Sequence, residues 1–215
     1  MIGEELVRWT GWDLRGGAHA DPSAAVEFAR SAPEDPTAGG RYELLAVAAR
    51  GFRPPRLLGV TRMGREGDAA NGSREPEHAG LRQTWELLYR TVAETAPVEV
   101  APFAIYLLGV DPPADASDDD LAVFNDFYTD VHLPEVAERR GALRAVRYEL
   151  VEAVRPPYRG APRFLAVYEL DEQSAANRRH SGPPYSSGPE VWRRHTTPWR
   201  LWYRRLDADA LPDLA

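Results

Sequence analysis

An internal repeat constrains the fold of this chain more than any other feature of its sequence. Four short segments of the first half recur in the second half, in the same order and 106 to 114 positions later. The matched pairs are RYEL at 41–44 and 147–150, RLLGV at 56–60 with RFLAV at 163–167, DAAN at 68–71 with SAAN at 174–177, and WELLYRTV at 85–92 with WRLWYRRL at 199–206. Duplication explains four ordered matches better than coincidence does. We therefore expect two copies of one structural unit, at residues 1–96 and 97–215.

The second copy shows the order of elements in that unit. An apolar run at 103–110 predicts a buried strand, and Ser117 followed by three acids predicts the start of a helix over 118–133. Further strands are expected at 143–154, 164–170 and 199–206, with a helical patch near 172–179. This β-α-β-β-α-β order is the ferredoxin-like split βαβ unit. The sequence thus predicts an α+β protein of two tandem ferredoxin-like units.

The first copy is less regular than the second. We expect a short helix near 22–31 and a brief one at 76–84. By itself the stretch 79–95 could be a helix, but the repeat predicts a strand at 85–92. The loop at 33–40 is rich in proline and glycine.

Composition excludes several classes of site. The 215 residues include no cysteine, so disulfides, thiolate nucleophiles and Cys-ligated metals are ruled out. All 26 basic residues are arginine, which excludes Schiff-base chemistry on a lysine. The net charge of −7 gives no reason to expect a nucleic-acid or membrane partner. Acids near the first residue and the lack of an 18-residue apolar run predict a cytoplasmic protein.

The helix expected from residue 118 carries the candidate chemistry. On a helical wheel its buried face consists of Leu121, Phe124, Tyr128 and Val131. Asn125, Tyr128 and His132 form a polar line on the same inward side. Since buried polar groups need partners, this line can form one wall of a cavity.

Pro134 disfavours helical geometry at Leu133 and can open a new turn as its first helical residue, so we expect His132 to lie beside a break in the helix. His132 can act as a general acid or base near neutral pH, and Tyr128 and Asn125 can stabilise a developing oxyanion. The alternative is that His132 and Tyr128 are ordinary core residues.

The second half resembles the EthD-like branch of the dimeric α/β-barrel superfamily. The segment FNDFYTDVHLPEVAERRGALRAVRYEL, followed by RFLAVYEL, carries the likeness. Its motif residues here are Asn125, Asp126, Phe127, Tyr128, His132, Pro134, Glu135, Arg147, Tyr148, Tyr168, Glu169 and Leu170. The resemblance implies ferredoxin-like sheets that pair into a barrel, here within one chain as a pseudo-dimer. The first half lacks the motif, which implies one working cleft.

The resemblance also implies a function. Members of the branch include aromatic polyketide cyclases, so we expect a cofactor-free cyclase, isomerase or dehydratase of secondary metabolism acting on a hydrophobic aromatic or polyketide-like molecule. A cofactor-free monooxygenase and a non-catalytic ligand-binding or accessory protein are the alternatives. The chain would be a monomer (a pseudo-dimer) or a homodimer, without a metal or an organic cofactor. A haem ligand is a minor alternative, because relatives of the fold include haem proteins.

The expected site combines this helix with aromatic residues nearby. The candidate catalytic residues are His132, Tyr128 and Asn125. The candidate substrate-binding residues are Phe124, Tyr106, Arg147, Tyr168, Trp192, Trp202, Tyr185 and His180. His180 and His195 flank the loop at 181–189, which could be a lid, and either could approach His132. Trp199 and Trp202 should lie on opposite faces of one strand.

Overall fold

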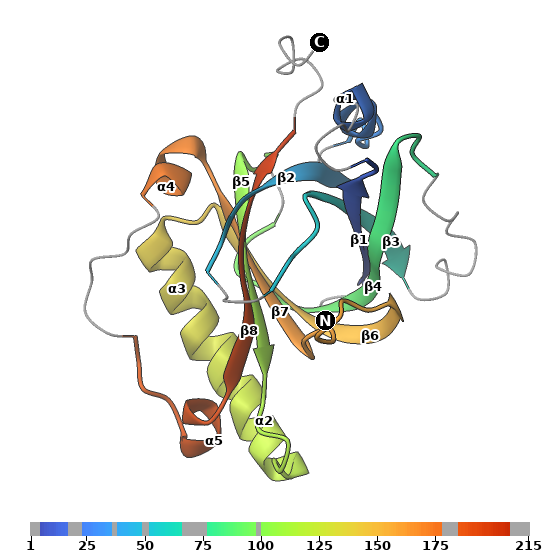
Figure 1. The fold of residues 1–215 in the computed structure, drawn as a ribbon. Coiled ribbons are helices and arrows are strands. Elements are labelled where there is room, and N and C mark those ends of the chain that lie inside the picture. Colours follow the sequence, from blue (N-terminus) through green and yellow to red (C-terminus); the bar gives the residue numbers. More distant parts are fainter. Residues whose placement is uncertain are drawn as a thin grey trace.

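The computed structural model describes residues 5–16, 23–35, 38–48, 52–65, 77–97, 100–177 and 185–206. Within these ranges the chain is an α+β fold in which an antiparallel barrel carries a few helices on its outside (Figure 1). The elements are β1 (Glu5–Leu14), α1 (Ser23–Arg30), β2 (Gly39–Val47), β3 (Leu57–Arg65), β4 (Leu81–Glu94), β5 (Ala104–Asp111), α2 (Asp118–Phe127), the π-helical turn η4 (Tyr128–His132), α3 (Leu133–Arg140), β6 (Arg144–Arg155), β7 (Phe164–Leu170), α4 (Glu172–Ala176), α5 (Glu190–Arg193) and β8 (Thr196–Arg205).

The strand order confirms the ferredoxin-like fold. The closed barrel runs β1-β3-β2-β8-β5-β7-β6-β4. Each half forms a four-stranded sheet in the same order, β4-β1-β3-β2 and β8-β5-β7-β6. The two sheets join edge to edge through antiparallel pairs, β2 with β8 and β4 with β6. Closure leaves neither sheet with a free edge. The predicted division at residues 96 and 97 falls between β4 and β5, and the assignment of two domains stays a prediction.

The interior of the barrel is a packed core. One cluster of buried residues draws on all eight strands, from Val7 and Trp9 on β1 to Trp199 and Tyr203 on β8. Strand side chains alternate in direction, so every second residue of each strand enters this core. Trp85 stacks on Trp199 with ring centroids 4.7 Å apart. The barrel is therefore filled by side chains at its centre.

A second core lies outside the barrel in the second half. It buries the outer faces of β5 and β7 under α2, η4 and α3, with Trp192 of α5 closing one side (Figure 1). Trp202 belongs to this outer core while Trp199 belongs to the interior one, which confirms that they lie on opposite faces of β8. A smaller outer cluster packs Phe28 of α1 against Trp12 in the first half.

The repeat identified the strands of the first half correctly. Residues 85–92 lie within β4, as the repeat predicted and as the local sequence alone did not. The brief helix expected at 76–84 is wrong over its described part, because β4 already begins at Leu81. Tertiary pairing of β4 with β1 and β6 overrides the local helical propensity here.

The helix of the second half starts as predicted but does not break at Pro134. Ser117 caps α2 through a capping box with Asp120. The backbone of Leu133 stays helical, and its N–H bonds to the carbonyl of Tyr128, which makes a π-helical turn. This turn inserts an extra residue and lets the helix continue as α3 to its cap at Gly141, where φ is 61°. The predicted break at Pro134 is therefore wrong.

The π-helical turn also changes which residues face inward. A wheel of constant pitch places Val131 on the buried face, yet Val131 is exposed. Phe124 and Tyr128, which precede the inserted residue or begin the turn, are fully buried as expected. Across the described ranges, no helix combines the length and the apolar character needed to cross a membrane.

Candidate functional site

One wall of the candidate site is the continuous helix of the second half. His132, Val136 and Arg140 recur every four residues along η4 and α3, so they lie above one another on the face toward the sheet. Tyr128 precedes them by one π turn and is fully buried. The helix therefore presents an imidazole, an apolar side chain and a guanidinium in one line.

The facing wall is the outer surface of the sheet. Tyr106, Leu108 and Val110 alternate along β5 and point to the same side. β8 lies next to β5 and adds Thr197 and Arg200. The indole of Trp202 stacks on Tyr106 at 4.3 Å and fixes the orientation of that ring.

Between these walls lies a cavity of about 260 Å³. Its volume is close to the lower end of the range usual for small-molecule sites. It is lined by Tyr106, Leu108, Val110, Tyr128, His132, Val136, Arg140, Tyr185, Ser186, Trp192, His195, Thr197 and Arg200. The lining is mainly aromatic and aliphatic, with two imidazoles and two guanidinium groups. No aspartate or glutamate is among these described lining residues.

His132 lies in an aromatic enclosure. Its ring centroid is 4.5 Å from that of Trp192, 5.6 Å from Tyr185 and 5.7 Å from Tyr128. Burial lowers the pKa of His132 from 6.5 to about 4, because the charged form loses its hydration. The ring is therefore neutral at pH 7, and its buried Nδ1 has no hydrogen-bond partner in the described part of the chain.

A second imidazole lines the same cavity. His195 stacks on Trp192, with ring centroids 4.3 Å apart. Its Nδ1 lies 2.5 Å from the carbonyl oxygen of Trp192. If Nδ1 carries the proton it donates to this carbonyl, and Nε2 then keeps a free lone pair.

Tyr128 contributes a hydroxyl group to the lining of the cavity. The side chain is fully buried, and its hydroxyl has no hydrogen-bond partner among the described residues. Burial raises the pKa of Tyr128, so the phenol stays protonated and can donate a hydrogen bond. Burial also raises the pKa of Tyr106, while the nearby positive charges of Arg140 and Arg200 act to lower it.

A short segment, residues 185–189, closes the cavity beside the helix and is called the closing segment below. Glu135 accepts hydrogen bonds from the backbone N–H of Ser186, at 3.1 and 3.2 Å, and from its hydroxyl. The same carboxylate pairs with Arg139 at 2.5 Å. Gly188 has φ of 65°, and a side chain there would meet Trp192 and Phe127 at about 2.5 Å. The segment is thus fastened at one end and tightly packed at the other.

The structure brings five of the predicted site residues to the cavity and places the other described ones beside or behind it. Tyr106, Tyr128, His132, Tyr185 and Trp192 line the cavity. Phe124, Tyr168 and Trp202 lie behind it in the outer core, and His180 lies outside the described residues.

The half-buried Asn125 and the buried Arg147 form a separate pair. The guanidinium of Arg147 donates to the side-chain oxygen of Asn125 and, at 3.0 Å, to Thr129. It lies over the rings of Tyr128 and Phe164, at 4.5 and 4.3 Å. Burial lowers the pKa of Arg147 to about 10, which leaves it charged at pH 7. This pair holds the helix to β6 beside the cavity, and its predicted role in binding stays a prediction.

Sequence reasoning missed the arginines of the cavity. Arg140 follows His132 by two helical turns, so continuing the wheel past Pro134 would have found it. Arg200 gave no comparable signal, because β8 meets β5 only through the long-range pairing of strands. The sequence indicated that His195 could approach His132, and both side chains line this cavity.

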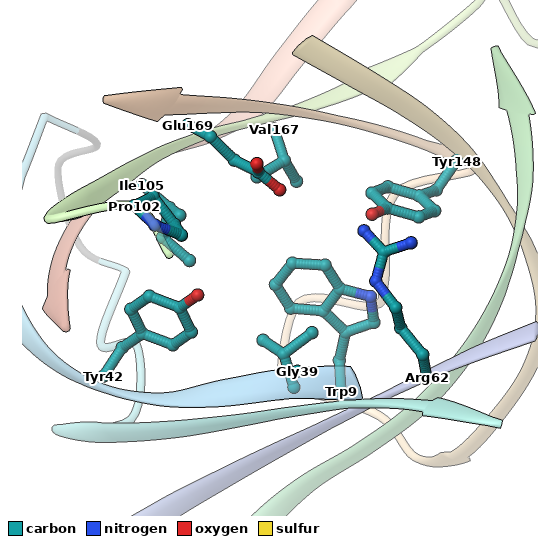
Figure 2. A pocket seen from close by; sticks show the side chains of 10 residues that line it. Trp9, Gly39, Tyr42, Arg62, Pro102, Ile105, Tyr148, Val167 and Glu169 are labelled. Carbon is teal, nitrogen blue, oxygen red and sulfur yellow. The ribbon is translucent and has the colours of Figure 1, made fainter. Parts of the chain in front are cut away.

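A second, smaller pocket lies at one end of the barrel interior. Figure 2 shows the Tyr42 hydroxyl and the Glu169 carboxylate pointing toward the same space, with the Trp9 ring at its side and Arg62 near Tyr148. Burial raises the pKa of Tyr42 to about 12 and also raises that of Glu169. The pocket holds about 30 Å³, enough for a water molecule but not for an organic ligand. We therefore take the outer cavity as the candidate site.

Within the part of the chain that the structure describes, no group of three or more histidine, aspartate or glutamate side chains is arranged to hold a metal ion. The donors at the cavity are instead single imidazoles set among aromatic rings. Such a setting suits a metal already carried by an organic macrocycle, or an organic ligand alone.

Comparisons with known proteins agree on the fold. No family model matches the sequence, and no curated protein matches it significantly. Among solved structures, a haem-binding protein from Thermus thermophilus aligns with a TM-score of 0.56 and 12% identity, covering 98% of this chain and 94% of that one. A putative chlorite dismutase aligns at 0.58 and 12% identity, with 96% of each chain covered. A mutant chlorite dismutase from Candidatus Nitrospira defluvii aligns at 0.54 and 11%, with 97% and 94% covered.

These matches correct the expected function. The prediction of a cofactor-free, polyketide-type cyclase is wrong, because the structures that share the whole fold are a haem-binding protein and chlorite dismutases. The motif that suggested a cyclase lies on a helix and strands of the ferredoxin-like fold. It therefore indicated the fold and not the reaction. What the comparisons establish for this chain is the ferredoxin-like barrel.

Proposed function

We propose that this protein is a haem-dependent protein that binds haem in the outer cavity, where His132 would hold the iron. The observation that carries the proposal is the neutral imidazole of His132, whose buried Nδ1 has no partner in an aromatic cavity. The haem-binding protein that shares the fold supports haem as the bound group.

The donor set of the cavity fits haem. An axial ligand must be an unprotonated imidazole, and the pKa of about 4 keeps His132 in that form at pH 7. The flat rings of Tyr106 and Trp192 can pack against a macrocycle, and Arg140 and Arg200 supply positive charge for its carboxylates. At about 260 Å³ the cavity is smaller than a whole porphyrin, so uptake requires the segment at 185–189 to move outward.

Each residue has a distinct role in this proposal. When bound, haem supplies an iron centre for one-electron and oxygen chemistry. His132 would hold the group, and the ring of Trp192, which packs against both His132 and Tyr128, would keep the imidazole in place. Leu108 and Val110 exclude water from the sheet side. The protonated hydroxyl of Tyr128 can donate a hydrogen bond to a polar group in the cavity.

The EthD-like resemblance supports only a ferredoxin-like fold with a site in the second half of the chain. The partner is a small molecule, and whether the chain works as a monomer or as a homodimer stays a prediction. Nothing in the charge of −7 favours nucleic acid.

The test is a haem titration followed by absorbance. The purified protein should develop a Soret band with one equivalent of haem, and its spectrum should show imidazole ligation. His132→Ala should weaken haem affinity by more than about tenfold, since even partners of metal ligands contribute that much. Added imidazole should restore the wild-type spectrum by filling the vacated space.

Two comparisons make the titration decisive. His195→Ala should keep the spectrum of the wild type, because His132 is the proposed ligand. Circular dichroism of each variant verifies that it is folded. A wild-type chain with no saturable haem binding, or a His132→Ala variant with unchanged affinity and spectrum, contradicts the proposal.

A further inference from the structure

Two arginines line the outer cavity without an acidic partner. Arg140 is the last residue of α3, and Arg200 lies on the facing strand β8. Neither forms an ion pair with any of the described residues. Arg139, next to Arg140, shows the contrast, because it is paired with Glu135 at 2.5 Å. The chain thus neutralises one arginine of this helix end and leaves the cavity-facing one uncompensated.

Arg140 is held in place by rings rather than by a carboxylate. Its guanidinium carbon lies 4.2 Å from the ring centroid of Tyr106 and 5.5 Å from that of Trp202. These contacts orient a cation but satisfy no N–H group in its plane. The Nε atom of Arg140 is buried and has no hydrogen-bond partner within the described ranges. A buried charged donor without an acceptor is unfavourable unless something else binds it.

Arg200 lies close to the same ring from the other wall. Arg200 is exposed, and its positive charge, like that of Arg140 over the face of the Tyr106 ring, lowers the pKa of Tyr106 against the effect of burial. The two guanidinium groups therefore meet at Tyr106. Glu135, which accepts the backbone N–H of Ser186, is already paired with Arg139. The positive charge at this end of the cavity is left for a ligand.

We infer that Arg140 and Arg200 bind a carboxylate group of the ligand and thereby select acidic aromatic or porphyrin ligands over neutral ones of the same shape. The inference rests on the proposed function for the location of the ligand, but it concerns a different part of the molecule from the iron. In haem the group would be a propionate. Arginine suits this role because its planar fork can donate two parallel hydrogen bonds to a carboxylate.

The experiment compares each acid with its ester. Binding of haem and of haem dimethyl ester is followed by quenching of tryptophan fluorescence, since Trp192 lines the cavity. A second pair, 2-naphthoate and its methyl ester, is small enough for the cavity as it stands. We expect the wild type to prefer the acid of a pair by about tenfold or more, as for hydrogen bonds to charged groups.

Variants assign the preference to the two arginines. Arg140→Gln and Arg200→Gln should each lose most of the preference for the acid while binding the ester as the wild type does. Arg204→Gln is the matched control, because Arg204 lies on the same strand and pairs with Glu43 away from the cavity. Its preference should equal that of the wild type.

The outcomes separate this inference from the proposed function. Saturable naphthoate binding with an acid preference, but no haem binding, would refute the haem proposal and support the arginine site. If the protein binds haem and its ester equally, and naphthoate and its ester equally, the haem proposal is supported and the arginine site is refuted. The inference is overturned if neither pair shows an acid preference, or if that preference survives in both arginine variants.

Discussion

The protonation of His132 should make the free energy of unfolding depend on pH. The unfolded chain carries this histidine with a pKa of 6.5, whereas burial holds it at about 4 in the fold. Between these values the unfolded state binds the extra proton, so the stability present above pH 6.5 is lost as the pH falls toward 4. At ~1.4 kcal/mol per pH unit, the full loss is about 3 kcal/mol, of which about 2 kcal/mol has gone by pH 5.

The variant His132→Phe isolates this contribution. Phenylalanine keeps an aromatic ring in the enclosure formed by Tyr128, Tyr185 and Trp192 but has no titrating group. Urea unfolding of the ligand-free wild type and the variant is measured between pH 7.5 and 5. Titration of the carboxylates is common to both proteins and cancels in the difference. A difference in unfolding free energy that stays constant over this range would refute the assignment of a buried, neutral imidazole.

Two further substitutions test how the helix and the closing segment are held. Ser117→Ala removes the hydroxyl that accepts the N–H of Asp120. The free energy of unfolding, measured in urea, should fall by about 1 kcal/mol. A loss of less than a few tenths of a kcal/mol would contradict the capping box. Gly188→Ala adds a methyl group about 2.5 Å from Trp192 at φ of 65°, and should destabilise the fold by about 1–3 kcal/mol. Gly160→Ala is its control, because φ there is 83° but nothing lies within 4 Å, so an equal loss would mean that packing against Trp192 is not the cause.

Part of the site could be predicted from the sequence because it depends on local periodicity. His132 and Tyr128 fall on the inward face of one helix, and both line the cavity. The same reasoning failed at Val131, since a π-helical turn shifts the phase of every later residue. It also ended the helix too early at Pro134, and so it missed Arg140.

Other parts of the site depend on contacts between distant segments. Asn125 shares the inward side of the helix, yet it pairs with Arg147 because β6 brings that guanidinium beneath it. The wheel gives no information about what faces a side chain from another element. Arg200 entered the cavity in the same way, through the pairing of β8 with β5.

The sequence by itself determined the repeated unit. The recurrence of RYEL and its companion segments predicted three matching strands in each half, including the strand at 85–92 that local propensity left ambiguous. Only the tertiary structure decided that the sheets close through β2 with β8 and β4 with β6, and that a cavity remains outside them. The physical reason is range: periodicity and capping act within a few residues, whereas edge pairing and cavity lining join segments far apart along the chain, about which a single sequence carries little direct signal.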